Sequence, residues 1–256
     1  MAAYNPLAAN EMLKDGSNPE GADPAPPLNW KGAKDFQDVA LYGMHCSPPC
    51  CKMMAYLYKY NIPFKMVSGQ SKPGSDYKKM PVLDVSGRQV NDSFIILKNL
   101  IPALTGGFDE EWEVLCSYQL APSIEWTLSP ADAAKWMSEP YGFGLPGCLL
   151  KCCLAKVLLE NVVKKGIQKS LDTMPDKVKI IPLNDLGTKL RHRLAARNFS
   201  TGARPGQVDI SFYGILAPFY YKECENVRSM VKDCGLQEWW NRMEKEIPME
   251  KLFPPK

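Results

Sequence analysis

The chain has 256 residues, of which 31 are basic and 28 acidic, and 45% of its residues are hydrophobic. This length is enough for one large or two small domains, and the hydrophobic content excludes a wholly disordered chain. The two charge signs nearly balance, with a net charge of +3. This balance excludes the strongly basic surface typical of nucleic-acid-binding proteins, so we expect no nucleic-acid partner.

The cysteine and histidine content argues against a disulfide framework and against a metal site. The nine cysteines include the adjacent pairs Cys50-Cys51 and Cys152-Cys153, which disulfide geometry does not bridge easily. A reducing compartment is therefore expected. His45 and His192 are the two histidines, and the sequence has no Cys-x-x-Cys pair. We therefore predict no metal site.

Residues 1–37 form a predicted N-terminal extension rich in Pro, Ala, Asn and Gly. They contain no arginine and no apolar run, so neither a cleavable mitochondrial presequence nor a secretory signal is recognised. The most apolar later stretch, 145–159, includes two lysines and is shorter than the roughly 20 apolar residues that span a bilayer. We expect no transmembrane segment, and a mitochondrial or cytoplasmic protein that is soluble or peripheral to a membrane.

The first structured region, 38–103, has the pattern of a small α/β domain. Its element order is β-α-β, a polar loop, and then β-β-α. The residues before Pro63 end the first helix, and Ser86-Gly87 joins two short strands as a hairpin. A parallel crossover followed by an antiparallel hairpin is the thioredoxin-like arrangement. The expected strands are 39–42, 64–67, 82–85 and 88–90, and the expected helices are 52–60 and one that begins near Ser93.

After Pro102 the pattern becomes helical. Thr105-Gly106-Gly107 is a plausible linker, and we predict a helical domain over 109–250. The fold class is therefore an α/β thioredoxin-like domain followed by an all-α domain, which is the glutathione-transferase architecture. Segments with helical periodicity are 109–128, 145–172, 184–199, 207–222 and 225–246.

A cysteine-rich segment, Cys46 to Lys52, lies at the predicted turn from the first strand to the first helix. A helix start presents unpaired N–H groups and a positive dipole end, and both stabilise a thiolate there. The Ser47 hydroxyl could donate a hydrogen bond to the sulfur of bound glutathione. Alternatively, Ser47 is only the helix N-cap, with Pro48 in the first turn.

Two further motifs follow at the expected spacing for a thioredoxin-like domain. Met80-Pro81 precedes a strand, and a cis bond there would direct the Met80 backbone toward an extended peptide ligand; the alternative is a trans proline that opens the strand. Asp92-Ser93 opens a helix, where the Ser93 hydroxyl and backbone N–H groups would suit the γ-glutamyl carboxylate of glutathione. Here the alternative is helix capping alone.

These segments resemble known sequences. LYGMHCSPPCCK resembles the active-site segment of glutathione transferases and glutaredoxins. SDYKKMPVLDV, QVNDSFIIL, ARPGQVDISFYGIL and LQEWWNRMEKEI resemble the membrane-associated prostaglandin E synthase type two family within the glutathione-transferase superfamily. The resemblance implies glutathione bound between the two domains, a homodimer, and heme held together with glutathione. It also implies membrane association through an N-terminal hydrophobic segment, which residues 1–37 do not contain.

The resemblance assigns the site residues and shows where this chain differs. It implies catalytic roles for Ser47 and Cys50, and glutathione binding by Met80, Pro81, Asp92 and Ser93. The family motif is Cys-Pro-Phe-Cys, whereas this chain has Ser47-Pro48-Pro49-Cys50. Some glutathione-transferase classes use a serine at the first position. Pro49 lacks an N–H and disfavours a helical Pro48, so the helix is expected to begin about one residue later with fewer donors for a thiolate.

Two functions remain open from the sequence. The first is a glutathione-binding, thiol-dependent transferase, isomerase or peroxidase that resembles prostaglandin E synthase. The second is a catalytically decayed accessory subunit of a larger, mitochondrial protein complex, which the N-terminal extension could contact. The altered Ser-Pro-Pro-Cys site favours the second function, and the Met-Pro and Asp-Ser motifs favour the first.

Overall fold

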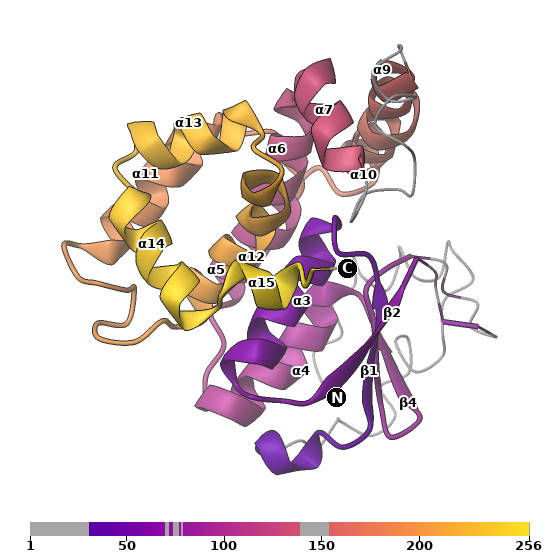
Figure 1. Cartoon of the computed structure of the whole chain (residues 1–256), viewed down its shortest axis with the longest axis vertical. Helices are drawn as coiled ribbons and strands as arrows, with labels where there is room; N and C mark the ends of the chain where they lie inside the picture. Colours follow the sequence, from indigo (N-terminus) through magenta and orange to yellow (C-terminus); the bar gives the residue numbers. More distant parts are fainter. Residues whose placement is uncertain (1–30, 70–71, 74–76, 78, 139–153, 256) are drawn as a thin grey trace.

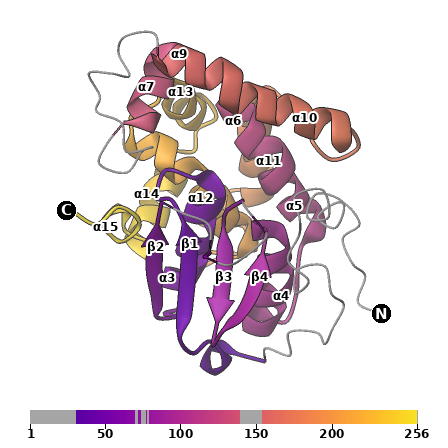
Figure 2. The same ribbon diagram turned by 90° about the vertical axis from the view of Figure 1, so that its right-hand side faces the viewer.

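The structure, a computed structural model, describes residues 31–69, 72–73, 77, 79–138 and 154–255. Its N-terminal part is built on a mixed four-stranded sheet in the order β2-β1-β3-β4 (Figures 1 and 2). β1 (Val39–Gly43) pairs in parallel with β2 (Phe64–Ser68) and antiparallel with β3 (Val82–Val85), which pairs antiparallel with β4 (Arg88–Asn91). The predicted thioredoxin-like arrangement is confirmed.

The hairpin between β3 and β4 turns where the sequence predicted. Ser86 and Gly87 have φ values of 53° and 84°, the left-handed pair that a two-residue hairpin turn requires. The β3–β4 register pairs Val82 with Asn91, and the β1–β3 register pairs Tyr42 with Val82. The segments that follow β1, precede β3 and follow β4 therefore meet at one end of the sheet, which is the end that carries the candidate site.

Helices α3 (Pro48–Lys59) and α4 (Ser93–Thr105) cover one face of this sheet (Figure 1). α3 begins four residues earlier than its hydrophobic pattern indicates. α4 ends at Gly106, whose φ of 81° is the left-handed C-cap typical of glycine. A short helix, η1 (Ala33–Asp35), precedes β1, and Phe36 after it is buried in the core.

The rest of the chain is helical, as predicted, and α12 lies at its centre. Two differences from the predicted segments have local causes. The segment 225–246 divides into two helices at Gly235, where φ is 64°, and the helix predicted over 184–199 ends at Leu194, before the left-handed Ala195. Residues 145–153 lie outside the described residues. The helices are α5 (Glu110–Leu115), η2 (Cys116–Leu120), α6 (Ala121–Thr127), α7 (Pro130–Met137), α9 (Ala155–Leu158), η4 (Leu159–Lys164), α10 (Lys165–Thr173), α11 (Leu183–Leu194), α12 (Gln207–Tyr221), α13 (Glu225–Asp233), α14 (Gln237–Glu246) and α15 (Met249–Leu252).

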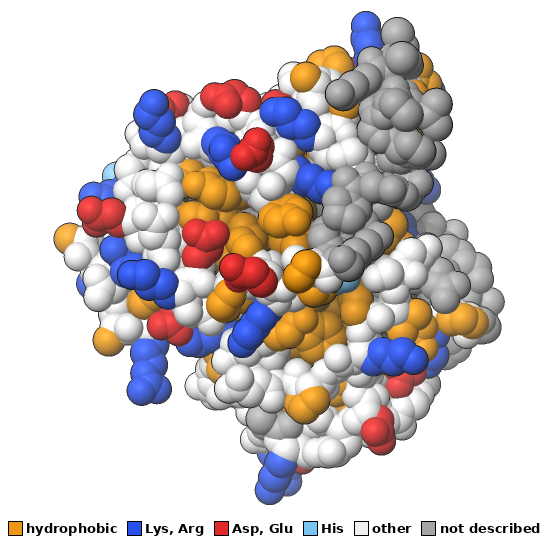
Figure 3. All heavy atoms as spheres, in the orientation of Figure 1, with side chains coloured by type: hydrophobic (Ala, Val, Ile, Leu, Met, Phe, Trp, Pro, Cys, Tyr) orange, Lys and Arg blue, Asp and Glu red, His pale blue; other side chains and the backbone are white. Residues whose placement is uncertain are grey.

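The two parts of the chain meet where α3 packs against α12. Gly214 in α12 lies so close to α3 that a Cβ atom there would be 2.5 Å from the Cα of Lys52. A glycine is therefore required for this approach. Figure 3 shows hydrophobic side chains gathered inside the ring of α12, α13 and α14, with charged side chains around its rim. Among the described residues, none of the helices has the length and apolar character needed to span a bilayer.

Candidate functional site

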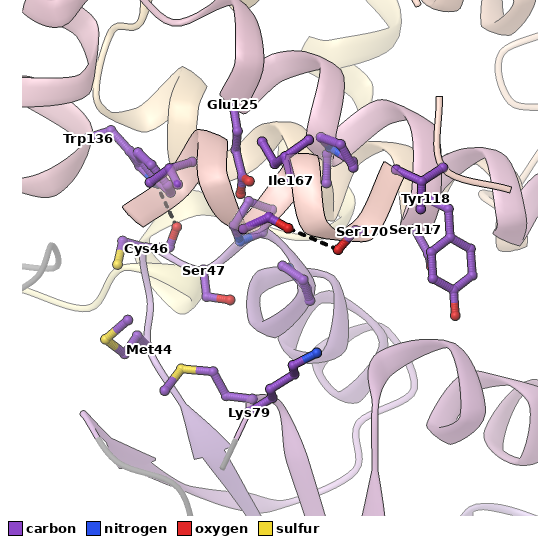
Figure 4. A pocket seen from close by; sticks show the side chains of 18 of the residues that line it. Met44, Cys46, Ser47, Lys79, Ser117, Tyr118, Glu125, Trp136, Ile167 and Ser170 are labelled. Atoms are coloured by element: carbon purple, nitrogen blue, oxygen red, sulfur yellow. Dashed lines mark hydrogen bonds between the residues drawn. The ribbon is translucent and has the colours of Figure 1, made fainter. Parts of the chain in front are cut away.

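A cleft of about 500 Å³ lies between the N-terminal sheet layer and the helical part (Figure 4). One wall comes from the loop after β1 and the start of α3, together with Lys79 and Met80 before β3. The opposite wall comes from η2, α6, α7, η4 and α10. The cleft is thus built by segments far apart in the sequence, and its lining includes Ser47 and Met80, two of the residues that the sequence analysis selected.

Ser47 is the N-cap of α3, with extended φ and ψ values of −78° and 119°, and its side chain makes no capping hydrogen bond. The helix begins at Pro48, so the expectation that it begins about one residue later is wrong. The reason is that N–H groups of a first helical turn have no intrahelical partner, so a proline there removes no hydrogen bond. Pro48 and Pro49 do remove two donors, because neither carries an N–H. The first intrahelical bond is from the Cys51 N–H to the Ser47 carbonyl, at 2.9 Å.

Cys50 lies in the core and does not line the cleft. Its side chain is fully buried against Gly43, where any Cβ atom would be 2.4 Å from the Cys50 Sγ. Burial raises the pKa of the Cys50 thiol to about 11, against smaller opposing effects of hydrogen bonds from the Ser47 side chain and the Met44 backbone. A thiol of this pKa is almost entirely protonated at neutral pH, so it is a poor nucleophile.

Of the described cysteines, Cys46, and not Cys50, is in the lining of the cleft. It is 2% exposed, and its carbonyl oxygen accepts a hydrogen bond of 2.8 Å from the Trp136 indole N–H on the helical wall. Burial, with a smaller contribution from nearby Cys50, raises the pKa of the Cys46 thiol to about 12. The backbone of Cys46 therefore links the loop to α7, whereas its side-chain thiol is not activated.

The other predicted glutathione-binding residues lie at the same end of the sheet. The Met80-Pro81 bond is cis, as predicted, and Pro81 is buried directly before β3. Asp92 is the N-cap of α4, and its carboxylate accepts hydrogen bonds from the backbone N–H groups of Phe94 (2.8 Å) and Ile95 (3.4 Å). Ser93, the first residue of α4, is 6% exposed. Pro81, Asp92 and Ser93 are not in the lining of the cleft, although the strand register places them beside Met80.

The helical wall contributes residues that the sequence analysis did not select. Glu125 of α6 and Trp136 of α7 extend toward the loop that carries Ser47 (Figure 4). Burial in this apolar wall raises the pKa of the Glu125 carboxyl group to about 7. The sequence offers one weak signal, a single acidic residue in the otherwise uncharged segment 121–127. That this residue faces a cleft follows only from how α6 packs.

Ser117, also in the cleft lining, belongs to a buried polar network that reaches α3. Lys52 and Glu113 are both 0% exposed and form an ion pair of 2.5 Å. Lys52 also donates a hydrogen bond of 2.6 Å to the Ser117 hydroxyl, which donates to Glu113 at 3.0 Å. η2, which carries Ser117, is a π-helical turn, a feature often found at functional sites. A charge on α3 thus holds part of the opposite cleft wall in place.

Metal-binding chemistry has no support in the described part of the chain. Within it, no three His, Cys, Asp or Glu side chains are grouped so that they could hold a metal ion. The described lining of the cleft offers instead an apolar surface with hydroxyl groups at Ser47 and Ser117, a backbone segment at Met80, and an acidic side chain at Glu125.

Comparison with protein-family models and with curated proteins gives no match. Comparison with solved structures gives matches along most of the chain. A glutathione S-transferase from Xanthobacter autotrophicus is 16% identical, with a TM-score of 0.52, and the match covers 85% of this chain and 98% of that one. Poplar glutathione transferase F1 is 13% identical, with a TM-score of 0.52, and the match covers 85% and 97% of the two chains. The chain therefore has the fold of glutathione transferases, with a thioredoxin-like part followed by a helical part.

Proposed function

We propose that this protein binds glutathione in the cleft and acts as a glutathione-transferase-like enzyme. The observation that carries the proposal is the meeting of Ser47 and Met80, from separate segments of the predicted 38–103 domain, on one wall of a cleft that the helical part closes. The fold shared with glutathione transferases supports the same proposal.

In this proposal the cysteinyl part of glutathione lies along the Met80 backbone, and the Ser47 hydroxyl donates a hydrogen bond to the thiolate. The γ-glutamyl carboxylate lies at the start of α4, where Ser93 supplies a hydroxyl and Asp92 fixes the first turn of the helix. Pro81 holds the Met80 segment against the sheet. Cys50 has no place in the reaction, because it is buried in the core and its pKa is raised to about 11.

In this proposal the glutathione thiolate faces the apolar part of the cleft, and this arrangement suits nucleophilic attack by the sulfur. The thiol loses its proton to solvent, and the sulfur then attacks an electrophilic carbon or a peroxide oxygen of a second substrate in the cleft. The resemblance to prostaglandin E synthase makes isomerisation of a cyclic peroxide the finer form of this proposal. The thiolate forms an S–O bond as the O–O bond breaks, and the freed oxygen takes a proton. Loss of the proton on the carbon that bears the S–O oxygen then forms a carbonyl group and expels the thiolate, so glutathione is regenerated.

Heme, which the resemblance also implies, does not fit the described cleft. None of the described lining residues is a histidine. Cys46, the cysteine among the described lining residues, is a poor metal ligand because burial raises the pKa of its thiol to about 12. We therefore propose no heme-dependent step.

A second candidate function is a glutathione-transferase-like accessory subunit that has lost catalysis. The observation that favours it is the start of α3, where Pro48 and Pro49 occupy the first two helical positions and withhold two N–H donors from the cleft. A thiolate at Ser47 would then be stabilised less than at an ordinary helix start. In this candidate function, a homodimer or a larger mitochondrial assembly would use the fold as a scaffold.

Calorimetric titration of the full-length protein with glutathione tests the proposal. We expect binding at millimolar or lower glutathione, and roughly ten- to hundredfold weaker binding for Ser93→Ala, because a hydrogen bond to a charged group contributes about 1.5–3 kcal/mol. Ser229→Ala, on α13 and outside the cleft lining, is the matched control and should bind like the wild type. If the wild type gives no heat at millimolar glutathione, the enzymatic proposal fails. Binding without turnover of chlorodinitrobenzene would favour the accessory-subunit function.

A further inference from the structure

Among the described residues that line the cleft, Glu125 is the acidic one, and it sits on the helical wall opposite the proposed glutathione site. It is partly buried on α6 and extends toward the segment that contains Ser47 (Figure 4). Among the described residues, no hydrogen bond or ion pair involves its carboxyl group. The function proposed above does not use this group.

The surroundings of Glu125 are apolar. The described lining on its side of the cleft includes Ala121, Pro122, Trp136, Val163 and Ile167. A carboxylate is costly in such surroundings unless a partner compensates its charge. A ligand that enters the cleft therefore meets both an apolar wall and an acidic group without a partner in the described structure.

Several charged groups on the neighbouring elements are paired with one another. On η4, which packs against α6, Lys164 pairs with Glu160 at 2.8 Å. On α13, Arg228 pairs with Glu223 at 3.0 Å. Other titratable or charged groups on this side of the cleft include Asp132 and Lys135 of α7, which pair at 3.2 Å; Tyr118 of η2; and the Cys46 thiol, with a pKa raised to about 12. Lys222, after α12, donates a hydrogen bond of 2.8 Å to the Ser138 carbonyl, and its charge lowers the pKa of the Cys46 thiol, whereas that of Glu125 raises it. Lys79 lies on the opposite wall.

We propose that the cleft takes, beside glutathione, a small and mostly apolar molecule that carries a protonated amine, and that this amine pairs with Glu125. The apolar body of the ligand covers the α6 and α10 wall, and its positive charge offsets the cost of the buried carboxylate. Ligand sites of this kind combine apolar walls with a few placed polar groups. The role of this molecule as second substrate rests on the function proposed above, whereas its binding does not.

The pairing has a defined pH dependence. The amine binds the ionised form of Glu125, so its affinity rises as the carboxyl group loses its proton. With a carboxyl pKa of about 7, the ionised fraction increases about tenfold between pH 6 and pH 8, and the affinity should increase by about the same factor. A primary alkylamine, with a pKa near that of lysine at about 10.4, stays protonated throughout this range.

The test compares three ligands of one shape: 4-phenylbutylamine, 4-phenylbutanol and 4-phenylbutyrate. Each is titrated calorimetrically into the full-length protein at about pH 6 and pH 8. We expect the amine to bind about tenfold more tightly at the higher pH and more tightly there than the other two ligands, and the alcohol to show no pH dependence. Glu125→Gln should weaken amine binding about tenfold at pH 8 and abolish its pH dependence. Glu111→Gln, which changes an exposed residue outside the cleft lining, should behave like the wild type.

Several results would overturn the proposal. These are absence of amine binding to the wild type, equal binding of amine and alcohol at pH 8, or amine binding that Glu125→Gln leaves unchanged. The wild-type comparison of the three ligands decides the question even if the variant does not fold. Glutathione is titrated into the same preparations. Amine binding without glutathione binding would contradict the proposed function alone, and glutathione binding without amine selectivity would contradict this inference alone.

Discussion

Burial of ionisable groups has different consequences at different residues around the cleft. It raises the pKa of Cys46 and Cys50 to about 12 and 11, so at pH 8 only about one Cys50 thiol in a thousand is ionised. These thiols are structural. For Glu125 the same effect raises the pKa of the carboxyl group from 4.5 to about 7. Its protonation therefore changes within the physiological pH range.

The raised pKa of Glu125 predicts a pH-dependent contribution to stability. Between about pH 4.5 and pH 7 the folded state holds a proton that the unfolded state has lost, so this contribution falls as the pH rises through that window. The loss is at most about 3 kcal/mol, at about 1.4 kcal/mol per pKa unit, and is smaller to the extent that water reaches the group. Glu125→Gln removes this contribution to the dependence of the free energy of unfolding on pH.

Urea unfolding at about pH 5 and pH 8 measures the effect. The free energy of unfolding of Glu125→Gln minus that of the wild type should be larger at pH 8 than at pH 5, because the variant does not lose this contribution to stability. Glu111→Gln controls for the loss of one negative charge, because this residue is exposed. A difference between wild type and Glu125→Gln that is the same at both pH values would show that the carboxyl group titrates normally.

At the scale of elements, the start of α3 decides how well the cleft can hold a thiolate. Pro48 and Pro49 take the first two helical positions, and the Cys51 N–H bonds to the Ser47 carbonyl. Of the N–H groups in the first turn, only that of Cys50 stays available. A family member with the motif Cys-Pro-Phe-Cys has phenylalanine at the second helical position, in place of Pro49, and would present one more N–H donor to the sulfur.

We predict that Pro49 raises the pKa of any thiol placed at position 47. Ser47→Cys combined with Pro49→Phe should give a thiol pKa lower by roughly half a unit to one unit than that of Ser47→Cys alone. The additional N–H and the positive end of the helix dipole stabilise the thiolate. The rate of alkylation at residue 47 as a function of pH, followed by peptide mass spectrometry, gives both values.

Pro49→Phe alone is the control for changes in packing, and its alkylation pattern should match that of the wild type. Equal thiol pKa values in the single and double variants would mean that Pro49 does not weaken the site. The main argument for a decayed catalytic centre would then be lost.

The sequence is sufficient to predict the elements whose signals are local. The four short strands and the Ser86-Gly87 turn depend on residues close together in the chain, and both were predicted. Thr105-Gly106-Gly107 was predicted as a linker, and Gly106 is the C-cap of α4. The first turn of α3 was placed incorrectly. Pro48 and Pro49 occupy the first two helical positions, where the backbone N–H of any residue would have no intrahelical partner, so the two prolines do not delay the helix. Glu125 was missed because its environment depends on the packing of α6 against segments far away in the chain.

At the scale of the whole molecule, a buried polar network joins the sheet layer to the helical part. Lys52 of α3 contacts Glu113 and Ser117, which lie on consecutive helices of the helical part. The Glu113 carboxylate also accepts a hydrogen bond of 2.6 Å from Ser211 of α12, whose hydroxyl lies 2.8 Å from that of Tyr56. The network connects four helices, α3, α5, η2 and α12, and reaches the cleft at Ser117.

This network explains how one cleft can be built from two parts of the chain. Gly214 allows the close approach of α3 and α12, and the ion pair beside it sets the position of η2 relative to α3. The ion pair is stable only as a unit, because each charge is fully buried and has been removed from water. Removing one charge should therefore do more damage than removing both.

Glu113→Gln tests this argument, because it keeps the shape of the side chain but leaves the Lys52 charge buried without its counter-ion. We expect the free energy of unfolding in urea to fall by about 3–5 kcal/mol. The double variant Lys52→Met/Glu113→Gln removes both charges and should recover much of that loss. Glu110→Gln is the matched control, since Glu110 is 52% exposed and its ion pair with Lys98 should contribute at most about 1 kcal/mol.

The contrary outcome is a double variant that is less stable than Glu113→Gln. If the second substitution lowers the free energy of unfolding as an independent mutation would, the two charges are not coupled. The joint between the two parts would then depend on the packing of α3 against α12 alone.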